Sequence, residues 1–194
     1  KTKIMKTKIL TLAIAILGFT TASFAQVAQN SSSTTAFATG TIITPINITG
    51  SNLIFGTIVT SNMESGSLTI SADGSNTTDK VVLYTGSGAV NPQASVFSVT
   101  GDAGNTFTIN VSGLPTVVTH TSDASATMAL SNWVSNNSSL NTSLGSAGTS
   151  ASGTGTLSAT GADSFNIGAK LTVGQSQKAG EYKSSAFTVT VNYN

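Results

Sequence analysis

The last eight residues of the chain constrain its fold more than any other stretch of the sequence. They read Phe-Thr-Val-Thr-Val-Asn-Tyr-Asn, so apolar and polar side chains alternate from Phe187 to the end. Successive side chains of a β-strand point to opposite faces of a sheet, and this alternation therefore predicts a strand with one apolar face. A strand needs a neighbour, so the pattern predicts a β-sheet protein and raises the question of what pairs with its last strand.

The first 25 residues are typical of an export signal. Lysines precede an apolar run over residues 9–19, which has the length of a signal core and is short for a membrane span. Met5 is the expected start, and residues 23–25 (Ser-Phe-Ala) place small side chains where a signal peptidase cleaves. We therefore expect a processed chain that begins at Gln26 with a flexible polar leader over 26–35 and contains no transmembrane span.

Composition excludes several classes of function. The processed chain keeps four lysines against seven carboxylates and has no arginine, so it cannot build the positive face that binds nucleic acid. Because it has no cysteine, core burial and sheet hydrogen bonds must stabilise it without disulfides. Serine and threonine are abundant, which fits strands with a hydroxyl-rich outer face.

Short runs of strand period recur along the chain, separated by Gly, Asn, Asp or Pro. We expect strands over 42–48, 53–59, 67–71, 80–85, 95–100, 106–112, 114–120, 126–130, 155–159, 165–173 and 187–193. The link over 101–105 (Gly-Asp-Ala-Gly-Asn) is expected to be a hairpin loop. A low-complexity stretch near 136–161 predicts a surface loop whose end pairs as a strand. The pattern predicts one all-β domain over 36–194, an antiparallel β-sandwich.

The same periodicity predicts which side chains form the core. Inward-facing positions are expected at Phe55, Leu83, Phe97, Phe107, Ile109, Phe165, Ile167, Leu171, Phe187, Val189 and Val191. Tyr182 is expected to bond its hydroxyl to the main chain near a turn, as corner tyrosines of sandwiches do.

The single histidine gives little support for catalysis. His120 lies near Ser122 and Asp123, which are the residue types of a catalytic triad. A triad is defined by geometry and needs an oxyanion hole, and a nearby serine carries little information in a serine-rich chain. We expect His120 at the surface end of a strand, and a protein that is not an enzyme.

Two other groups of residues invite a ligand. Asp73, Asn76 and Asp79 bring together oxygen atoms of the kind that calcium prefers, although a plain polar turn explains them as well. One histidine without cysteine argues against zinc, and we expect no cofactor. An exposed Trp133 or Tyr84 would favour stacking on a sugar, but Trp133 follows a strand-like run and is expected in the core.

Several short stretches, in a fixed order, resemble one bacterial family. They are residues 38–46 (Ala-Thr-Gly-Thr-Ile-Ile-Thr-Pro-Ile), 53–58 (Leu-Ile-Phe-Gly-Thr-Ile), 70–74 (Ile-Ser-Ala-Asp-Gly), 97–101 (Phe-Ser-Val-Thr-Gly), 171–174 (Leu-Thr-Val-Gly), 180–182 (Gly-Glu-Tyr) and 187–193. Over residues 36–194 the chain resembles the exported domain of unknown function 4402, to which no activity is assigned. That family is similar to spore-coat U and chaperone–usher pilin domains.

The resemblance implies an immunoglobulin-like, pilin-like antiparallel β-sandwich. Such domains often lack a strand that a neighbouring subunit supplies, and their last strand often ends in a penultimate tyrosine. The matching positions of this assembly strand are Phe187, Val189, Val191 and Tyr193. A donor segment would present an inward row of Ala36, Ala38, Gly40 and Ile42. Pilin domains often carry a disulfide, which this chain cannot form.

These observations predict a secreted structural protein of the bacterial cell surface, exported through the periplasm. We expect it to associate with itself or with other surface proteins through a strand edge. In a competing account, residues 36–48 pair with the last strand of the same chain and leave no vacancy. The alternative function is a surface adhesin or carbohydrate-binding module of the same fold.

Overall fold

The computed structural model describes residues 31–60, 63–146 and 150–194. The chain divides into two units, Lys1–Thr41 and Ile42–Asn194. The described residues of the first unit, 31–41, form no helix or strand and are exposed. The expected signal and most of the expected leader lie outside the described residues. No helix in the part of the chain that is described is long and apolar enough to cross a membrane.

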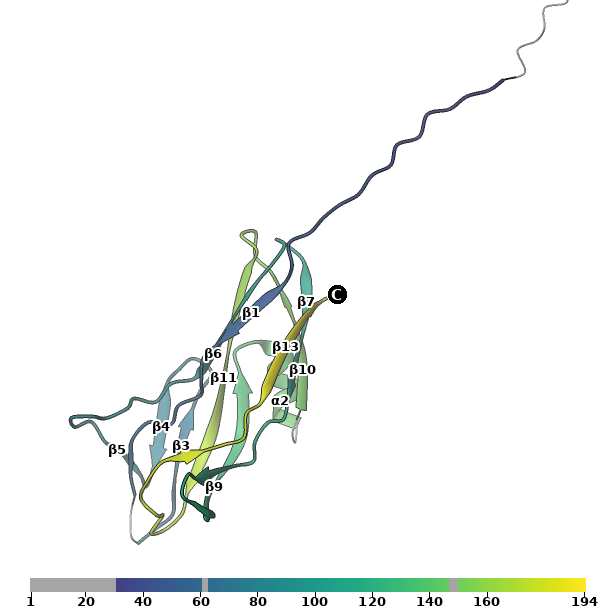
Figure 1. Ribbon diagram of the computed structural model, residues 1–194. Helices are drawn as coiled ribbons and strands as arrows, with labels where there is room; N and C mark the ends of the chain where they lie inside the picture. The colour runs from purple at the N-terminus through teal and green to yellow at the C-terminus, as the bar shows by residue number, and fades with distance from the viewer. Residues whose placement is uncertain (1–30, 61–62, 147–149) are drawn as a thin grey trace, which may run out of the picture. The chain divides into compact units, whose positions relative to one another are not determined.

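The second unit is an all-β fold of antiparallel strands, with one short helix among its described residues (Figure 1). The strands are β1 (Asn47–Gly50), β2 (Ile58–Val59), β3 (Gly66–Ile70), β4 (Asn76–Asp79), β5 (Val82–Leu83), β6 (Ser95–Thr100), β7 (Thr106–Ser112), β8 (Val117–His120), β9 (Asp123–Ser135), β10 (Ser150–Thr156), β11 (Ala162–Val173), β12 (Tyr182–Lys183) and β13 (Thr188–Tyr193). The helix is α2 (Ser138–Ser146).

The larger sheet is built around β11 and curls into a half-barrel. Its order is β1-β6-β11-β9-β8-β12 within the described residues, and β3 and β4 attach to one end of β11. The first half of β11 pairs with β6 and its last four residues pair with β3, so the long strand joins two parts of the sheet. A separate ribbon pairs Ile58 with Leu83 and Val59 with Val82.

The smaller sheet has the order β10-β7-β13 and two contrasting faces. Its inner face contributes Phe107, Ile109, Val111, Ala151 and Val191 to the core. Its outer positions are uncharged polar residues in register across the three strands, as the composition led us to expect. They are Thr106, Thr108, Asn110, Ser112, Ser150, Ser152, Thr154, Thr156, Thr188, Thr190 and Asn192.

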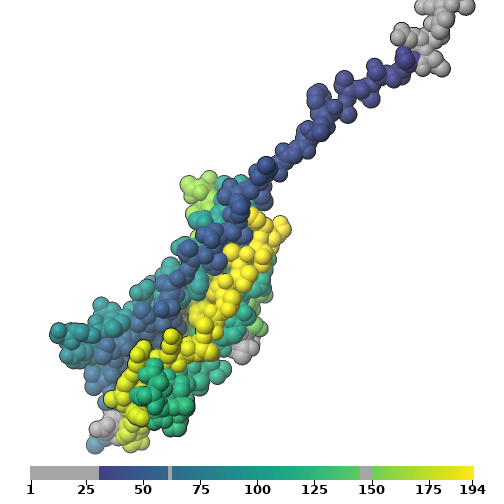
Figure 2. Space-filling model, viewed as in Figure 1, coloured from purple at the N-terminus to yellow at the C-terminus, as the bar shows by residue number. Residues whose placement is uncertain are grey.

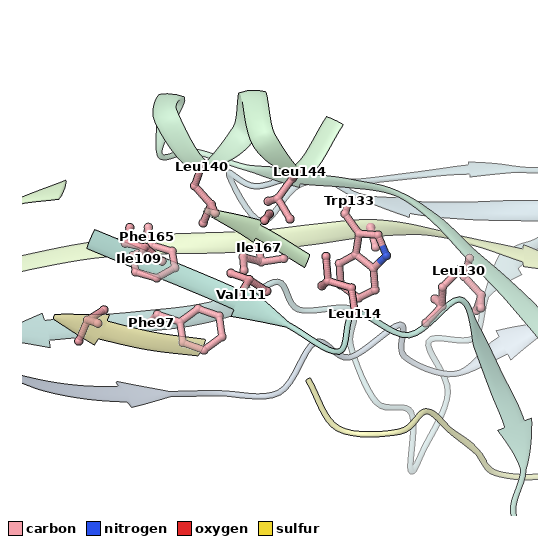
Figure 3. Close-up of a cluster of buried hydrophobic side chains, with 14 of the residues drawn as sticks. Phe97, Ile109, Val111, Leu114, Leu130, Trp133, Leu140, Leu144, Phe165 and Ile167 are labelled. Carbon is pink, nitrogen blue, oxygen red and sulfur yellow. The ribbon is translucent and has the colours of Figure 1, made fainter. Parts of the chain in front are cut away.

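The core lies between the two sheets and confirms the predicted inward positions (Figure 3). Seven of the eleven predicted side chains are buried: Phe97, Phe107, Ile109, Phe165, Ile167, Leu171 and Val191. The other four, Phe55, Leu83, Phe187 and Val189, are half-buried and pack against the same cluster. Trp133 is buried as well, with 7% of its surface exposed, as expected for a core anchor.

The link over residues 101–105 is not the hairpin loop that its composition predicted. Strands β6 and β7, which it joins, lie in different sheets and do not pair with each other. The link crosses between the sheets, and the Asp102 N–H donates to the hydroxyl of Tyr193. A turn sequence specifies a reversal of the chain, whereas the sheet that the next strand joins depends on distant partners.

Helix α2 lies in the low-complexity stretch where the sequence predicted a loop. Asn137 caps it, because its side-chain oxygen accepts the N–H of Leu140 at 2.9 Å. Leu140 and Leu144, four residues apart, both point into the core (Figure 3). The seven other residues of the helix are small and polar and give almost no helical periodicity, so burial of two leucines stabilises a segment with weak intrinsic preference.

Candidate functional site: an open strand edge and the cleft beside it

Strand β13 forms one edge of the smaller sheet. It pairs with β7 from Thr188 to Tyr193, and the N–H of Asn194 donates to Thr106 O at 3.2 Å. Main-chain groups of an antiparallel strand point alternately to its two neighbours. Residues 188, 190 and 192 therefore bond to β7, and the main-chain groups of Val189 and Val191 point to the open side. There they have no hydrogen-bond partner among the described residues.

Strand β1 forms the facing edge of the larger sheet. It pairs with β6 alone and lies beside β13, without hydrogen-bonded pairing between the two (Figures 1 and 2). The hydroxyl of Tyr193 donates to Thr44 O at 2.7 Å and so ties the end of β13 to the chain that leads into β1. The two sheets thus meet at two unpaired strand edges.

The pairing inside one chain that the competing account required is not found. Residues 42–46 form no strand, and β1 pairs with β6 rather than with β13. The proposed donor positions Ala36, Ala38 and Gly40 are exposed and in no regular structure, and Ile42 is 99% exposed. Proline at position 45 lacks the N–H that a strand would use, which fits the absence of a ladder there.

A cleft of about 1100 Å³ lies between the chain that follows β1 and the chain that precedes β13. Residues 50–58 form one wall and residues 177–187 form the other. Its floor is part of the apolar core, contributed by four strands of the larger sheet: Phe97, Val118, Met128, Leu130, Trp133, Leu171 and Val173. The core is therefore reachable just beyond the end of β1 and before the start of β13.

Aromatic side chains organise the floor of the cleft. Phe187, just before β13, meets Trp133 edge-on with ring centroids 5.6 Å apart and meets Phe97 at 6.3 Å. Phe97 stacks on Phe165 at 5.2 Å. Gly50, at the end of β1, lies against the Phe97 ring, where a Cβ atom would collide with it. These contacts couple the two unpaired edges to one cluster.

The second wall is held mainly by polar contacts. The hydroxyl of Tyr182 donates to Lys178 O at 2.8 Å, which confirms the predicted bond to the main chain near a turn. The side-chain amide of Gln177 donates to the same hydroxyl at 2.8 Å. Lys178 pairs with Asp123 at 2.6 Å. Hydrogen bonds from the side-chain ammonium of Lys178 and from the hydroxyl and N–H of Ser125 hold the pKa of the Asp123 carboxyl well below its usual range.

His120 contacts this wall from the end of β8 and does not form a catalytic triad. It ends strand β8 as predicted, but it is 7% exposed rather than at the surface. Its Nε2 lies 3.1 Å from Ala179 O, and its Nδ1 accepts the N–H of Ser122 at 3.1 Å. The carboxylate of Asp123 bonds to Ser125 and Lys178, not to the imidazole. The three residues therefore lack the serine–histidine–aspartate relay.

The three calcium candidates are not brought together. Asp73 lies in the turn between β3 and β4, where its carboxylate accepts the N–H and the hydroxyl of Ser75, and these bonds lower its pKa. Asn76 and Asp79 are the first and last residues of β4, about 10 Å apart at the rise of a strand. No cluster of three metal-ligating side chains occurs among the residues described.

The candidate sugar-stacking residues also lie apart. Trp133 lines the floor of the cleft, whereas Tyr84 is 44% exposed next to the β2–β5 ribbon. The strands and the core side chains were predictable from the sequence, whereas the cleft and the contacts of His120 with its wall were not. The only sequence signal for that wall was the Gly-Glu-Tyr stretch at 180–182, whose glycine lies against the histidine ring.

Comparison with known proteins adds one finding. The family model described as Domain of unknown function (DUF4402) matches residues 46–193, which is most of the chain. The chain therefore belongs to this family. Neither the curated proteins nor the solved structures contain a match. The matched region begins just before β1 and ends with β13, so it contains both unpaired edges and the cleft.

Proposed function

We propose that this member of the family is an exported structural subunit of the bacterial cell surface, which assembles by accepting a strand along β13. The observation that carries the proposal is the unpaired edge of β13 beside that of β1, with the core accessible in the cleft between the chain that follows β1 and the chain that precedes β13. An unpaired edge is a template for another strand, whose main chain supplies affinity while alternate side chains fill pockets.

The same observation supports an immunoglobulin-like, pilin-like sandwich from which one strand is missing. A three-stranded sheet opposes a larger curled sheet across one core, and both sheets end at the cleft. A single added strand between β1 and β13 would cover the aromatic floor and pair with Val189 and Val191. Closing a sheet edge in this way removes both the open hydrogen-bonding groups and the exposed apolar surface.

The occupant that we propose is the segment before β1 of a second copy. Residues 36–43 are exposed and carry two large apolar side chains that find no cover, Phe37 at 90% and Ile42 at 99% exposure. One face of an extended segment would present Ala36, Ala38, Gly40 and Ile42. The opposite face would present Phe37 and Ile43. If the first row faces the cleft, Ile42→Ser should weaken assembly more than Ile43→Ser, and the reverse order would indicate the second row.

Deletion of the donor segment tests the proposal. A chain processed at Gln26 should form oligomers in gel filtration and filaments or a coat in electron microscopy. A chain that begins at Thr44 should stay monomeric in gel filtration. It should bind an added peptide of residues 31–46. The same peptide with Ile42 and Ile43 replaced by Ser should bind at least about tenfold more weakly, which corresponds to a loss of about 1.4 kcal/mol in binding free energy. A sharp monomer peak from the intact processed protein at every concentration would refute assembly.

A sugar-binding adhesin is the second candidate, and one observation favours it. Tyr84, Val82 and Val59 leave an uncharged, partly aromatic surface exposed on the β2–β5 ribbon, away from the cleft floor. Aromatic faces of this kind stack on the apolar face of a sugar ring. Binding of the protein to a glycan panel, lost in Tyr84→Ala but kept in Val82→Ala, would support this role. Absence of binding to every glycan of the panel would refute a sugar-binding role.

A further inference from the structure

Strand β9 contains a β-bulge where it passes the floor of the cleft. Residues 129–131 pair with β11 in one register, and residues 134–135 pair with it in a register shifted by one. Between these stretches, Asn132 and Trp133 lie opposite the single residue Ala169. Asn132 has a φ of 50°, in the left-handed region. This is the kind of bulge whose first residue is ordinarily glycine, and such bulges re-aim a side chain next to a site.

The bulge turns Trp133 to the inside of the sheet. Before it, the even-numbered residues of β9 face inward, and Leu130 is buried. After it, the odd-numbered Trp133 and Ser135 are buried instead. Strand β11 keeps one alternation along its length, since its odd-numbered residues 165–173 are all buried. The shift therefore belongs to β9 alone, and without it Trp133 would lie on the outer face.

The side chain of Asn132 favours the bulge over a regular strand. Asparagine is one of the few residues besides glycine that tolerate a left-handed φ. In a regular register residue 132 would point inward, and burial of an amide without a hydrogen-bond partner is unfavourable. The other inward positions of that register, Met128, Leu130 and Val134, are apolar and would accept it. The identity of residue 132 therefore decides which face of β9 carries the tryptophan.

Trp133 presents its remaining accessible surface to the cleft. The side chain is only 7% exposed and lines the floor, and its indole nitrogen lies on the side of Leu130, another floor residue (Figure 3). No enclosed side-chain polar atom lacks a partner within the described ranges, so the indole N–H, which bonds to no described residue, is accessible. An indole only donates hydrogen bonds, and a buried one usually has an acceptor. The missing partner is therefore an acceptor such as a carbonyl oxygen.

We propose that Asn132 is the positioning residue of the cleft and that Trp133 is the docking point for the entering strand. The bulge holds the indole in the floor, where its ring packs against a large apolar side chain and its N–H donates to a main-chain carbonyl of that strand. The leader of a second copy fits this chemistry, because residues 31–46 carry no charge and include Phe37 and Ile42. The docking role rests on the proposed function, whereas the positioning role does not.

The emission of the single tryptophan tests the positioning role in dilute, intact processed protein. Asn132→Val disfavours the left-handed φ and completes an apolar inward row, so it should turn Trp133 outward. Its emission should shift to longer wavelength, and quenching by acrylamide should increase severalfold. Asn132→Gly should keep the parental values, because glycine adopts the bulge without strain. Parental emission in Asn132→Val would overturn the proposal.

Two further variants separate the bulge from a general loss of stability. Lys80→Val is the matched control, since Lys80 also has a positive φ, of 58°, but does not line the cleft. It should leave the emission unchanged, and an equal shift in this variant would refute the role of the bulge. Deletion of Asn132 removes the extra residue, so Leu130 and Trp133 both face inward by simple alternation. The deletion should keep the parental emission, and a shift to longer wavelength would contradict the proposal.

The concentration at which oligomers form in gel filtration tests the docking role separately. Asn132→Val should raise this concentration at least about tenfold, and Asn132→Gly should not. A shifted emission with unchanged assembly would refute docking on the indole and leave the positioning role standing. If emission and assembly are both unchanged in Asn132→Val, the positioning role fails and strand acceptance stands. If the intact parent stays monomeric at every concentration, the proposed function fails, and the emission alone decides the positioning role.

Discussion

The smaller sheet has one edge whose main-chain groups are hydrogen-bonded to side chains and one edge whose main-chain groups are left open. At the β10 edge, the hydroxyl of Ser143 accepts the Ser152 N–H at 2.9 Å and that of Ser139 accepts the Thr154 N–H at 3.2 Å. The side-chain amide of Asn137 also donates to Thr154 O at 3.0 Å. At the β13 edge, the main-chain groups of Val189 and Val191 have no such partner among the described residues.

The difference shows that an edge is closed when side chains replace the missing strand. Residues 137–143 supply one donor and two acceptors where a neighbouring strand would have supplied them, and two leucines of helix α2 anchor them on the core. Edge strands that are left open promote association, and proteins usually cover them. The chain covers one edge of its three-stranded sheet and leaves the β13 edge open, and this is the edge through which we propose that it associates.

Removal of a leucine that anchors helix α2 should have the largest effect on stability and should uncover the β10 edge. Leu140→Ala should destabilise the domain by about 2–5 kcal/mol, because the side chain is fully buried and leaves a cavity. Urea unfolding measures this loss, and amide exchange at Ser152 and Thr154 should show the β10 edge opening. Thr142→Ala, on the exposed side of the same helix, should stay within about 0.5 kcal/mol of the parent. Equal losses for both variants would contradict the anchoring role.

Loss of an aromatic group at the open edge should cost less. Phe187→Ala should lower stability by about 2–3 kcal/mol, below the roughly 3–5 of a fully buried phenylalanine, because Phe187 is half-buried. Trp133 is the only tryptophan and contacts this ring, so its emission should shift to longer wavelength. The matched control is Phe37→Ala, since Phe37 is 90% exposed and should leave the stability of the monomer unchanged. An unshifted emission in Phe187→Ala would argue that the edge and the floor are not coupled.

The serine hydroxyls that cover β10 should each contribute a smaller amount. Ser139→Ala and Ser143→Ala should each cost about 1 kcal/mol, the usual net value of one hydrogen bond. The amide hydrogen exchange rate of Thr154 should rise in Ser139→Ala, and that of Ser152 should rise in Ser143→Ala. Ser138→Ala is the control, because Ser138 lies on the same helix and its side chain makes no hydrogen bond to β10 among the described residues. A similar rise in all three variants would mean that the helix frays and that the hydroxyls are not specific covers.

A charge on the open edge should have almost no effect on the monomer but a clear one on assembly. Thr190→Lys and Asn110→Lys place the same charge on the same outer face, at positions directly opposite each other on β13 and β7. Both should remain within about 0.5 kcal/mol of the parent. Only the lysine on the edge strand should reduce oligomers in gel filtration, because charges on edge strands discourage strand addition. Equal inhibition by both variants would show that assembly uses the outer face and not the edge.

Local sequence was informative wherever a strand could be recognised by its own period. Strands 95–100 and 106–112 were predicted to the residue, and the strand near the end of the chain was predicted within one residue. The helix at 138–146 was missed because only Leu140 and Leu144 carry its apolar stripe and its other residues have weak helical preference. Asn137 followed by Leu140 was the one signal that could have indicated a helix start.

The alternation of side chains by itself determined the all-β class, the two faces of each main strand and most of the core. It could do so because the side-chain period of a strand is a local property of the backbone. Only the tertiary structure decided that β6 and β7 enter different sheets, that a helix covers β10, and that β13 and β1 face each other unpaired. Those choices depend on hydrogen bonds and burial between residues distant in sequence, and no local pattern contains that information.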